Sequence, residues 1–176
     1  MTNSEESSVV DESVIKVITA PKKAHIYGKL SGLLLVATEE EFQEYLSFDT
    51  TEREYNDEYE RSAALKAVMT MAEKEGVDFE QFYLFGAFNT QTTGMNDVNM
   101  NDPVWLDDET IYLKLDINSP MGNVTNDMAY YGFLYLVGKS VTKLKINNTT
   151  IILAEGLPES NLTEEERALE MLLGGF

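Results

Sequence analysis

Four oxygen-bearing side chains between residues 97 and 108 are spaced like the ligands of a twelve-residue calcium loop. Asp97, Asn99 and Asn101 take the first, third and fifth positions of such a loop, and Asp108 takes the twelfth. Carboxylate and amide oxygens are the ligands that Ca²⁺ prefers. However, Asp102 replaces the glycine that makes the sharp turn, and a strand rather than a helix is predicted after Asp108. We therefore favour a region of Asx turns, and predict neither a metal nor a cofactor.

Two further short patterns suggest chemistry. Gly138-Lys139-Ser140 resembles the end of a phosphate-binding loop, but Phe133 stands where the first glycine is required. His25 is the only histidine, and an imidazole is a general base near neutral pH. No serine lies in a Gly-x-Ser-x-Gly turn to receive that help, and the chain has no cysteine. We interpret His25 as a strand or turn residue and predict that the protein is not an enzyme.

Charge is the most pronounced property of the sequence. The chain has 31 acidic and 13 basic residues, a net charge of −18. Such a charge repels nucleic acid and anionic membranes, so we predict neither as a direct partner. Residues 39–60 hold ten acidic residues and one arginine, a local net of −9, whereas Lys139, Lys143 and Lys145 gather elsewhere. If folding places these groups on opposite sides, the acidic face of one copy meets the basic face of another. The alternative interpretation of such a charge run is a solvated helix face.

The residues predicted to contact a protein partner follow from this distribution. They comprise these three lysines and Trp105, whose indole is suited either to anchoring a partner or to plugging its own loop. The acidic members are Glu39, Glu40, Glu41, Glu44, Glu52, Glu54, Asp57 and Glu58.

Helices are predicted from their start signals. Thr38 followed by Glu39, Glu40 and Glu41 is a capping box, which predicts a helix beginning at residue 39. Residues 56–75 keep a helical period of apolar positions and end at Gly76. A second Thr-Glu-Glu-Glu box predicts a short helix over residues 163–173. The polar residues 1–12 predict an acidic N-terminal tail, and residues 13–176 a single domain.

Strands are predicted from alternating or continuous apolar runs. They cover residues 13–20, 33–37, 82–88, 110–117 and 130–137, with a hairpin of 141–146 and 149–154 turning at Asn147-Asn148. Residues 89–109, rich in Asn, Thr and Asp, predict a long loop. The fold class is therefore α+β, a mainly antiparallel sheet of about five to seven strands covered by two or three helices.

These features favour a non-enzymatic structural or interaction protein. We expect a subunit of a larger assembly, such as a phage-type virion, with copies of itself or other subunits as partners. The alternative is an acidic mimic of nucleic acid, whose carboxylates over residues 39–60 occupy a DNA-binding protein. An enzyme using scattered carboxylates is a third possibility. The sequence has no leader and no apolar run of about 20 residues, so we expect the cytoplasm or a virion assembled there.

Overall fold

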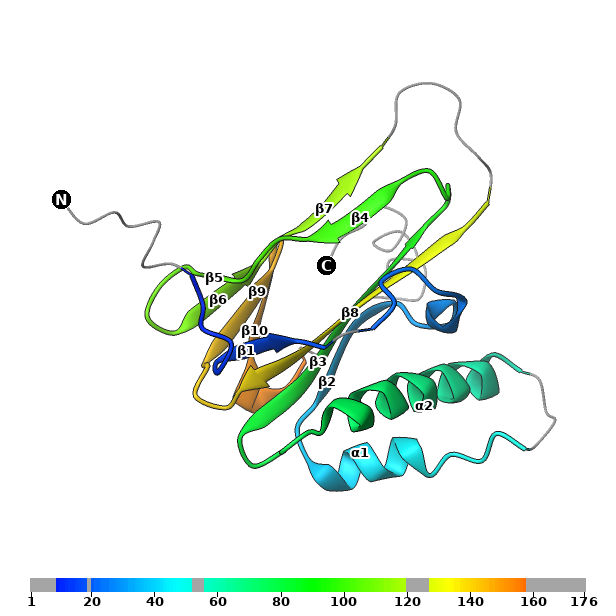
Figure 1. Cartoon of the computed structure of the whole chain (residues 1–176), viewed down its shortest axis with the longest axis horizontal. Helices are drawn as coiled ribbons and strands as arrows, with labels where there is room; N and C mark the ends of the chain where they lie inside the picture. The colour runs from blue at the N-terminus through cyan, green and yellow to red at the C-terminus, as the bar shows by residue number, and fades with distance from the viewer. Residues whose placement is uncertain (1–8, 19, 52–55, 120–126, 158–176) are drawn as a thin grey trace.

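The computed structural model describes residues 9–18, 20–51, 56–119 and 127–157, which form three layers (Figure 1). Two helices cover one face of a central four-stranded sheet, and a second four-stranded sheet covers the other. A two-stranded ribbon projects beyond the second sheet (Figure 1). The predicted α+β class is confirmed. The predicted strand number is too low, because the described residues alone contain ten strands in three mostly antiparallel sheets.

The central sheet is apolar on both faces because a layer covers each of them. Its strands are all antiparallel and lie in the order β1 (Ile15–Val17), β8 (Ala129–Gly138), β3 (Phe82–Gln91) and β2 (Gly32–Val36). The two inner strands, β3 and β8, pair along their whole length, from Phe82 opposite Gly138 to Gln91 opposite Ala129. Double burial explains why these two segments read as continuous apolar runs without alternation.

The helix layer begins at two side-chain caps. In α1 (Glu39–Leu46) the Thr38 hydroxyl accepts a hydrogen bond from the Glu41 amide at 3.2 Å. In α2 (Asp57–Glu75) the Asn56 side chain accepts one from the Tyr59 amide at 2.8 Å, and Gly76 ends the helix with a φ of 78°. Both helix predictions are confirmed. The residues that α1 and α2 bury against the central sheet are Phe42, Ala64, Leu65, Val68, Met69 and Ala72.

The second sheet has the order β10 (Thr149–Ile152), β9 (Lys143–Ile146), β6 (Thr110–Leu113) and β5 (Val104–Trp105). The β6–β9 pair is parallel, and the other two pairs are antiparallel. The β9–β10 hairpin turns at Asn147, which has a φ of 48°, as its sequence predicts. The buried residues that this sheet contributes to the core include Ile111, Leu113, Leu144, Ile146 and Ile151.

Two strand predictions are wrong in the same region. Residues 89–109 are not a long loop, because β3 continues to Gln91 and two further strands follow, β4 (Asp97–Met100) and β5. Residues 110–117 are not one strand but two, β6 and β7 (Leu115–Asn118), because β7 leaves the sheet to pair with β4. The Asn147 side chain stabilises the break between β6 and β7, because its oxygen accepts a hydrogen bond from the Leu115 amide at 2.8 Å.

The ends of the chain are partly described. Val9, within the predicted acidic tail, forms a β-bridge with Val104, and Val10 packs against the core. The helix predicted over residues 163–173 lies outside the described residues. Two short 3₁₀ helices complete the fold, η2 (His25–Tyr27) and η3 (Leu153–Glu155). No helix in the described ranges has the length and apolar content to cross a membrane.

A close contact fixes η2 against the central sheet. The Tyr27 side chain is fully buried, and its hydroxyl donates to the Pro21 carbonyl at 2.5 Å. The ring lies over β8 at Gly132, where a Cβ atom would be 2.6 Å from two of its carbons. Glycine is therefore required at this position, and the contact places His25 and Ile26 beside α2.

Candidate functional site

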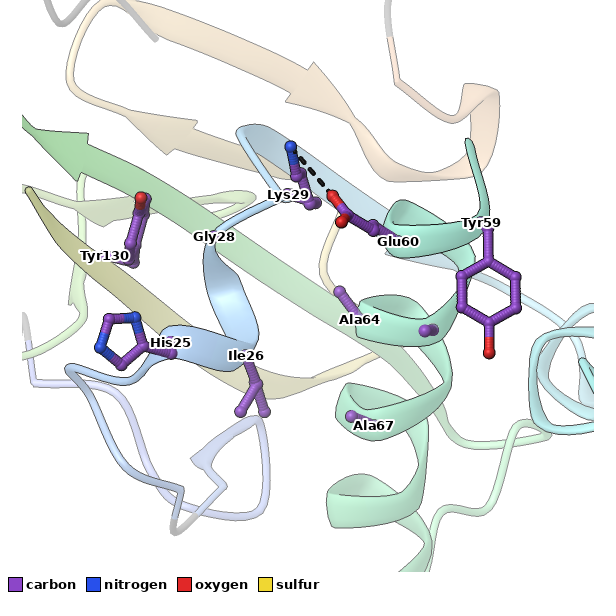
Figure 2. A pocket seen from close by; sticks show the side chains of 10 residues that line it. His25, Ile26, Gly28, Lys29, Tyr59, Glu60, Ala64, Ala67 and Tyr130 are labelled. Atoms are coloured by element: carbon purple, nitrogen blue, oxygen red, sulfur yellow. Dashed lines mark ion pairs between the residues drawn. The ribbon is translucent and has the colours of Figure 1, made fainter. Parts of the chain in front are cut away.

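A groove of about 510 Å³ lies between η2 and the first half of α2 (Figure 2). It is built from three parts of the chain that are far apart in sequence: η2 with its following turn, the N-terminal half of α2, and the start of β8. Its lining residues are His25, Ile26, Gly28, Lys29, Tyr59, Glu60, Ala63, Ala64, Ala67 and Tyr130.

The two walls of the groove differ in character. His25 and Tyr130 stand on one side with their ring centroids 5.9 Å apart, and Ala64 and Ala67 face them from α2 (Figure 2). The Tyr59 ring points away from this space, where its hydroxyl donates to a backbone carbonyl at residue 50 (Figure 2). The groove therefore has an aromatic wall opposite an alanine wall.

One end of the groove is closed by an ion pair. The Lys29 ammonium lies 3.0 Å from a Glu60 carboxylate oxygen and 3.2 Å from an Asp57 oxygen. The Glu60 hydrogen bond, followed by that of Asp57, raises the pKa of Lys29 above its usual value. This lysine therefore stays charged and ties the turn after η2 to the start of α2 (Figure 2).

The predicted acidic residues lie on the outer helix layer. Glu39, Glu40 and Glu41 form the first turn of α1, and Glu44 follows. Glu41 and Glu44 line a second groove of about 370 Å³ between α1 and α2. Asp57 and Glu58 begin α2, while Glu52 and Glu54 lie outside the described residues. Within the described ranges, no ion pair involves Glu39, Glu40, Glu44 or Glu58.

The predicted basic group does not stay together. The Lys139 ammonium donates to the Ala37 carbonyl at 3.0 Å, just before α1, so this lysine lies beside the acidic layer rather than opposite it. Lys143 and Lys145 lie on β9 in the outer sheet, across the molecule from the helices (Figure 1). Lys143 is paired with Glu109 at 2.9 Å. Lys139 therefore does not meet the condition for charge separation, that the lysines lie opposite the acidic residues.

The Lys145 ammonium lies 5.6 Å from the centre of the Tyr112 ring on neighbouring β6. Trp105, on β5, is half-buried and packs against the main core cluster.

The calcium-loop residues are not gathered around one point. Asp97 and Asn99 are exposed on the extended strand β4, opposite Asn118 and Asp116 of β7. Alternate residues of a strand are about 7 Å apart, and an extended strand does not wrap its ligands around one point as the calcium loop does. In the part of the chain that the structure describes, no three His, Cys, Asp or Glu side chains form a group suited to a metal.

The aspartate with a local structural role is instead Asp107, next to the predicted Asp108. Its carboxylate accepts hydrogen bonds from the amides of Glu109 and Thr110, at 2.9 and 2.8 Å. The Glu109 bond, followed by that of Thr110, lowers the pKa of Asp107 below its usual value. These bonds form the turn that leads into β6.

Comparison with known proteins gives no match: no family model, no curated protein and no solved structure is similar to this chain. Its function must therefore be argued from its own residues. The sequence pointed to the acidic layer but missed the η2–α2 groove. The sequence signal that could have indicated the groove is the pair Ala63 and Ala67. These alanines are four residues apart on α2 and are not among the residues that α2 buries in the core.

Proposed function

We propose that this protein is a non-enzymatic interaction protein, a subunit of a larger assembly that binds a basic protein surface through its acidic helix layer. The observation that carries the proposal is the set of exposed carboxylates at Glu39, Glu40, Glu44 and Glu58, which no described cation pairs. Complementary charge of this kind speeds association and selects the partner.

Helix stability accounts for only some of these carboxylates. Glu39 and Glu40, and likewise Glu58, lie in first helical turns, where negative charge is favoured by the helix dipole. Glu44 lies in the last turn of α1, where the same dipole disfavours it, and no basic residue is present in that turn. Helix capping therefore does not explain the charge of Glu44, and the described cation that lines the same groove is Arg61 of α2.

The setting we propose is an assembly made in the cytoplasm, such as a phage-type virion, with copies of this chain or other subunits as partners. Lys143 and Lys145 on the outer sheet offer a second contact surface on the opposite side of the molecule from the helices. A chain with two such surfaces can bind one neighbour on each side.

The test uses two variants that remove the same charge from different places. The helix-layer variant is Glu40→Gln/Glu44→Gln/Glu58→Gln, and the control is Asp97→Asn/Asp108→Asn/Glu155→Gln, whose three acids are exposed outside that layer. Self-association is measured by light scattering after gel filtration, at about 50 mM and about 500 mM salt. Partners from the source cell are retained on the immobilised protein and identified by mass spectrometry.

We expect salt-sensitive association that the helix-layer variant weakens by at least about tenfold and the control preserves. Equal weakening in both variants would mean that only net charge matters, and a strict monomer that retains no partner would refute the proposal. If the retained partner is a DNA-binding protein that DNA displaces, the chain acts as a mimic of nucleic acid instead.

A further inference from the structure

We propose that the groove between η2 and α2 binds an amphipathic helix with basic flanking residues, supplied by the partner protein. The proposal rests on the proposed function for the existence of a protein partner, and adds the structure and chemistry of the segment that it presents. Five observations carry it: the small side chains on α2, the openness of the groove, the hydrogen bonds already made by its backbone, the aromatic wall, and the charge at one end.

The alanine wall leaves room for another helix. Ala63 and Ala67 are one helical turn apart and only half-buried, whereas Ala64 between them is buried toward the core. Helices pack with their axes about 8–10 Å apart, and small side chains at the contact permit the closest approach. Because Ala64 packs within the fold, the exposed surface of Ala63 and Ala67 remains available to a partner.

The groove is too open to enclose a small molecule. His25 and Lys29 are exposed, and Ala64 alone among the lining residues, all of them described, is buried. Sites for small ligands cover most of the ligand surface, usually about 70–90%. A groove of this depth instead suits side chains that project from a larger partner, which stays mostly outside it.

The edge of β8 that reaches the groove is already paired with residues 22–24, which excludes a strand added at that edge. The Ala24 amide donates to the Tyr130 carbonyl at 3.1 Å, and the Gly132 amide donates to the Lys22 carbonyl at 2.9 Å. Lys23 also forms a β-bridge with Tyr131. Binding by strand addition needs a free row of amides and carbonyls, whereas a helix is bound through its side chains. The groove therefore fits a helix.

The aromatic wall and its surroundings define the partner's apolar face. The Tyr130 hydroxyl donates to the Met128 sulfur at 3.7 Å, and Met128 is 53% exposed, so the apolar wall continues beyond the groove. Unbranched thioether side chains adapt to the shape of a partner. We therefore expect the partner helix to place leucine-like side chains between Tyr130 and Ala67.

The charge at the end of the groove that the Lys29 ion pair closes indicates which charge the flanking residues of the bound helix carry. Asp57 keeps 94% of its side chain exposed although it contacts Lys29, and Glu58 beside it is exposed as well. A lysine or arginine at one end of the bound helix would meet these carboxylates. An acidic flank would be repelled by them and by the net charge of −18.

The probe is a synthetic fluorescein-labelled peptide of about 18 residues, made of leucine and lysine in an amphipathic helical pattern. A second peptide with glutamate in place of lysine keeps the apolar face and reverses the charge. Fluorescence anisotropy is measured with the full chain. We expect saturable binding of the lysine peptide with a Kd below about 100 µM, and no binding of the glutamate peptide.

Two variants on α2 test the location. Ala67→Leu fills the groove and is expected to weaken binding at least about tenfold. Ser62→Leu enlarges a side chain that faces α1 instead, and is expected to leave binding within about twofold. His25→Ala, which shortens an exposed wall residue, is expected to weaken binding about threefold. This variant tests the location if Ala67→Leu does not fold.

The outcomes separate this proposal from the proposed function. For this comparison Glu58 is left unchanged, because the groove proposal itself uses it. Binding that Glu40→Gln/Glu44→Gln abolishes but Ala67→Leu and His25→Ala leave intact would overturn the groove and keep the acidic layer as the binding surface. Binding that Ala67→Leu abolishes and Glu40→Gln/Glu44→Gln preserves would support the groove without that layer. No binding of the lysine peptide at about 100 µM, or equal binding of both peptides, would overturn the groove proposal.

Discussion

Replacing Gly132 by alanine tests the contact that fixes η2 on the central sheet. The added Cβ atom would lie 2.6 Å from the Cε1 and Cζ atoms of Tyr27, far inside van der Waals contact. The ring cannot move away, because Tyr27 is fully buried and its hydroxyl is bonded to Pro21. Overpacking of this kind costs about 1–3 kcal/mol, and the entropy that alanine saves in the unfolded chain returns about 0.5–1 kcal/mol.

We expect Gly132→Ala to lower the free energy of unfolding by about 1 kcal/mol in urea at 25 °C. For a chain of this length each kcal/mol corresponds to about 2–4 °C, so Tm falls by about 2–4 °C. The unfolding transition can be followed by circular dichroism. The η2–α2 groove contains residues next to Tyr27, so the same variant is expected to weaken binding of the lysine peptide.

A double-mutant cycle identifies the clash as the cause. Tyr27→Leu removes most of the ring, and in that background Gly132→Ala is expected to cost less than about 0.5 kcal/mol. If Gly132→Ala costs the same in both backgrounds, the strand backbone rather than the ring requires glycine, and the reasoning fails.

Two further predictions concern the outer sheet. Asn147→Gly keeps the positive φ of the turn but removes both side-chain bonds to Leu115, so we expect a loss of about 1–2 kcal/mol in urea unfolding; unchanged stability would contradict the role of Asn147 at the β6–β7 break. The pKa of Asp107 is lowered in the folded state by the amides of Glu109 and Thr110, so its contribution to stability is present above the unfolded pKa near 4 and is lost as pH falls through the folded value. Asp107→Asn should therefore flatten the loss of stability in acid, measured as Tm between pH 5 and 2, whereas the neighbouring Asp108→Asn should not.

Local signals in the sequence predicted local structure well. The Thr38 cap, the end of α2 at Gly76 and the turn at Asn147 each depend on a few adjacent residues, and each is found where the pattern places it. The acidic first turns of both helices follow from the same short-range signals.

The errors arose where long-range pairing decides the structure. Asp97 and Asn99 suggested a loop, yet they tolerate a strand because β4 belongs to a narrow ribbon that leaves their side chains in water. The break at Lys114 is invisible in sequence because burial of Leu113 and Leu115 continues the alternation across it. What breaks the strand is its pairing with β4, which only the fold reveals.

The candidate site likewise has one part that local sequence predicts and one part that depends on long-range pairing. The carboxylates of α1 could be predicted from charge alone. The groove could not, because Tyr130 comes from β8 and meets His25 only through the pairing of residues 22–24 with that strand. Lys139 shows the converse: its neighbours in sequence suggested a basic patch, but the end of β8 brings it to the start of α1.

The order of strands in the central sheet also governs how the molecule is made. β8 lies between β1 and β3, so β1 stays apart from the β2–β3 pair until the chain has been synthesised through residue 138. Pairings this distant close large loops and form slowly. The helices can shield one face of β3 early. The other face, with Tyr83, Phe85 and Ala87, stays exposed until the second sheet forms, and much of that sheet follows β8 in the chain. The half-synthesised chain, rather than the finished protein, is therefore the state most prone to aggregation.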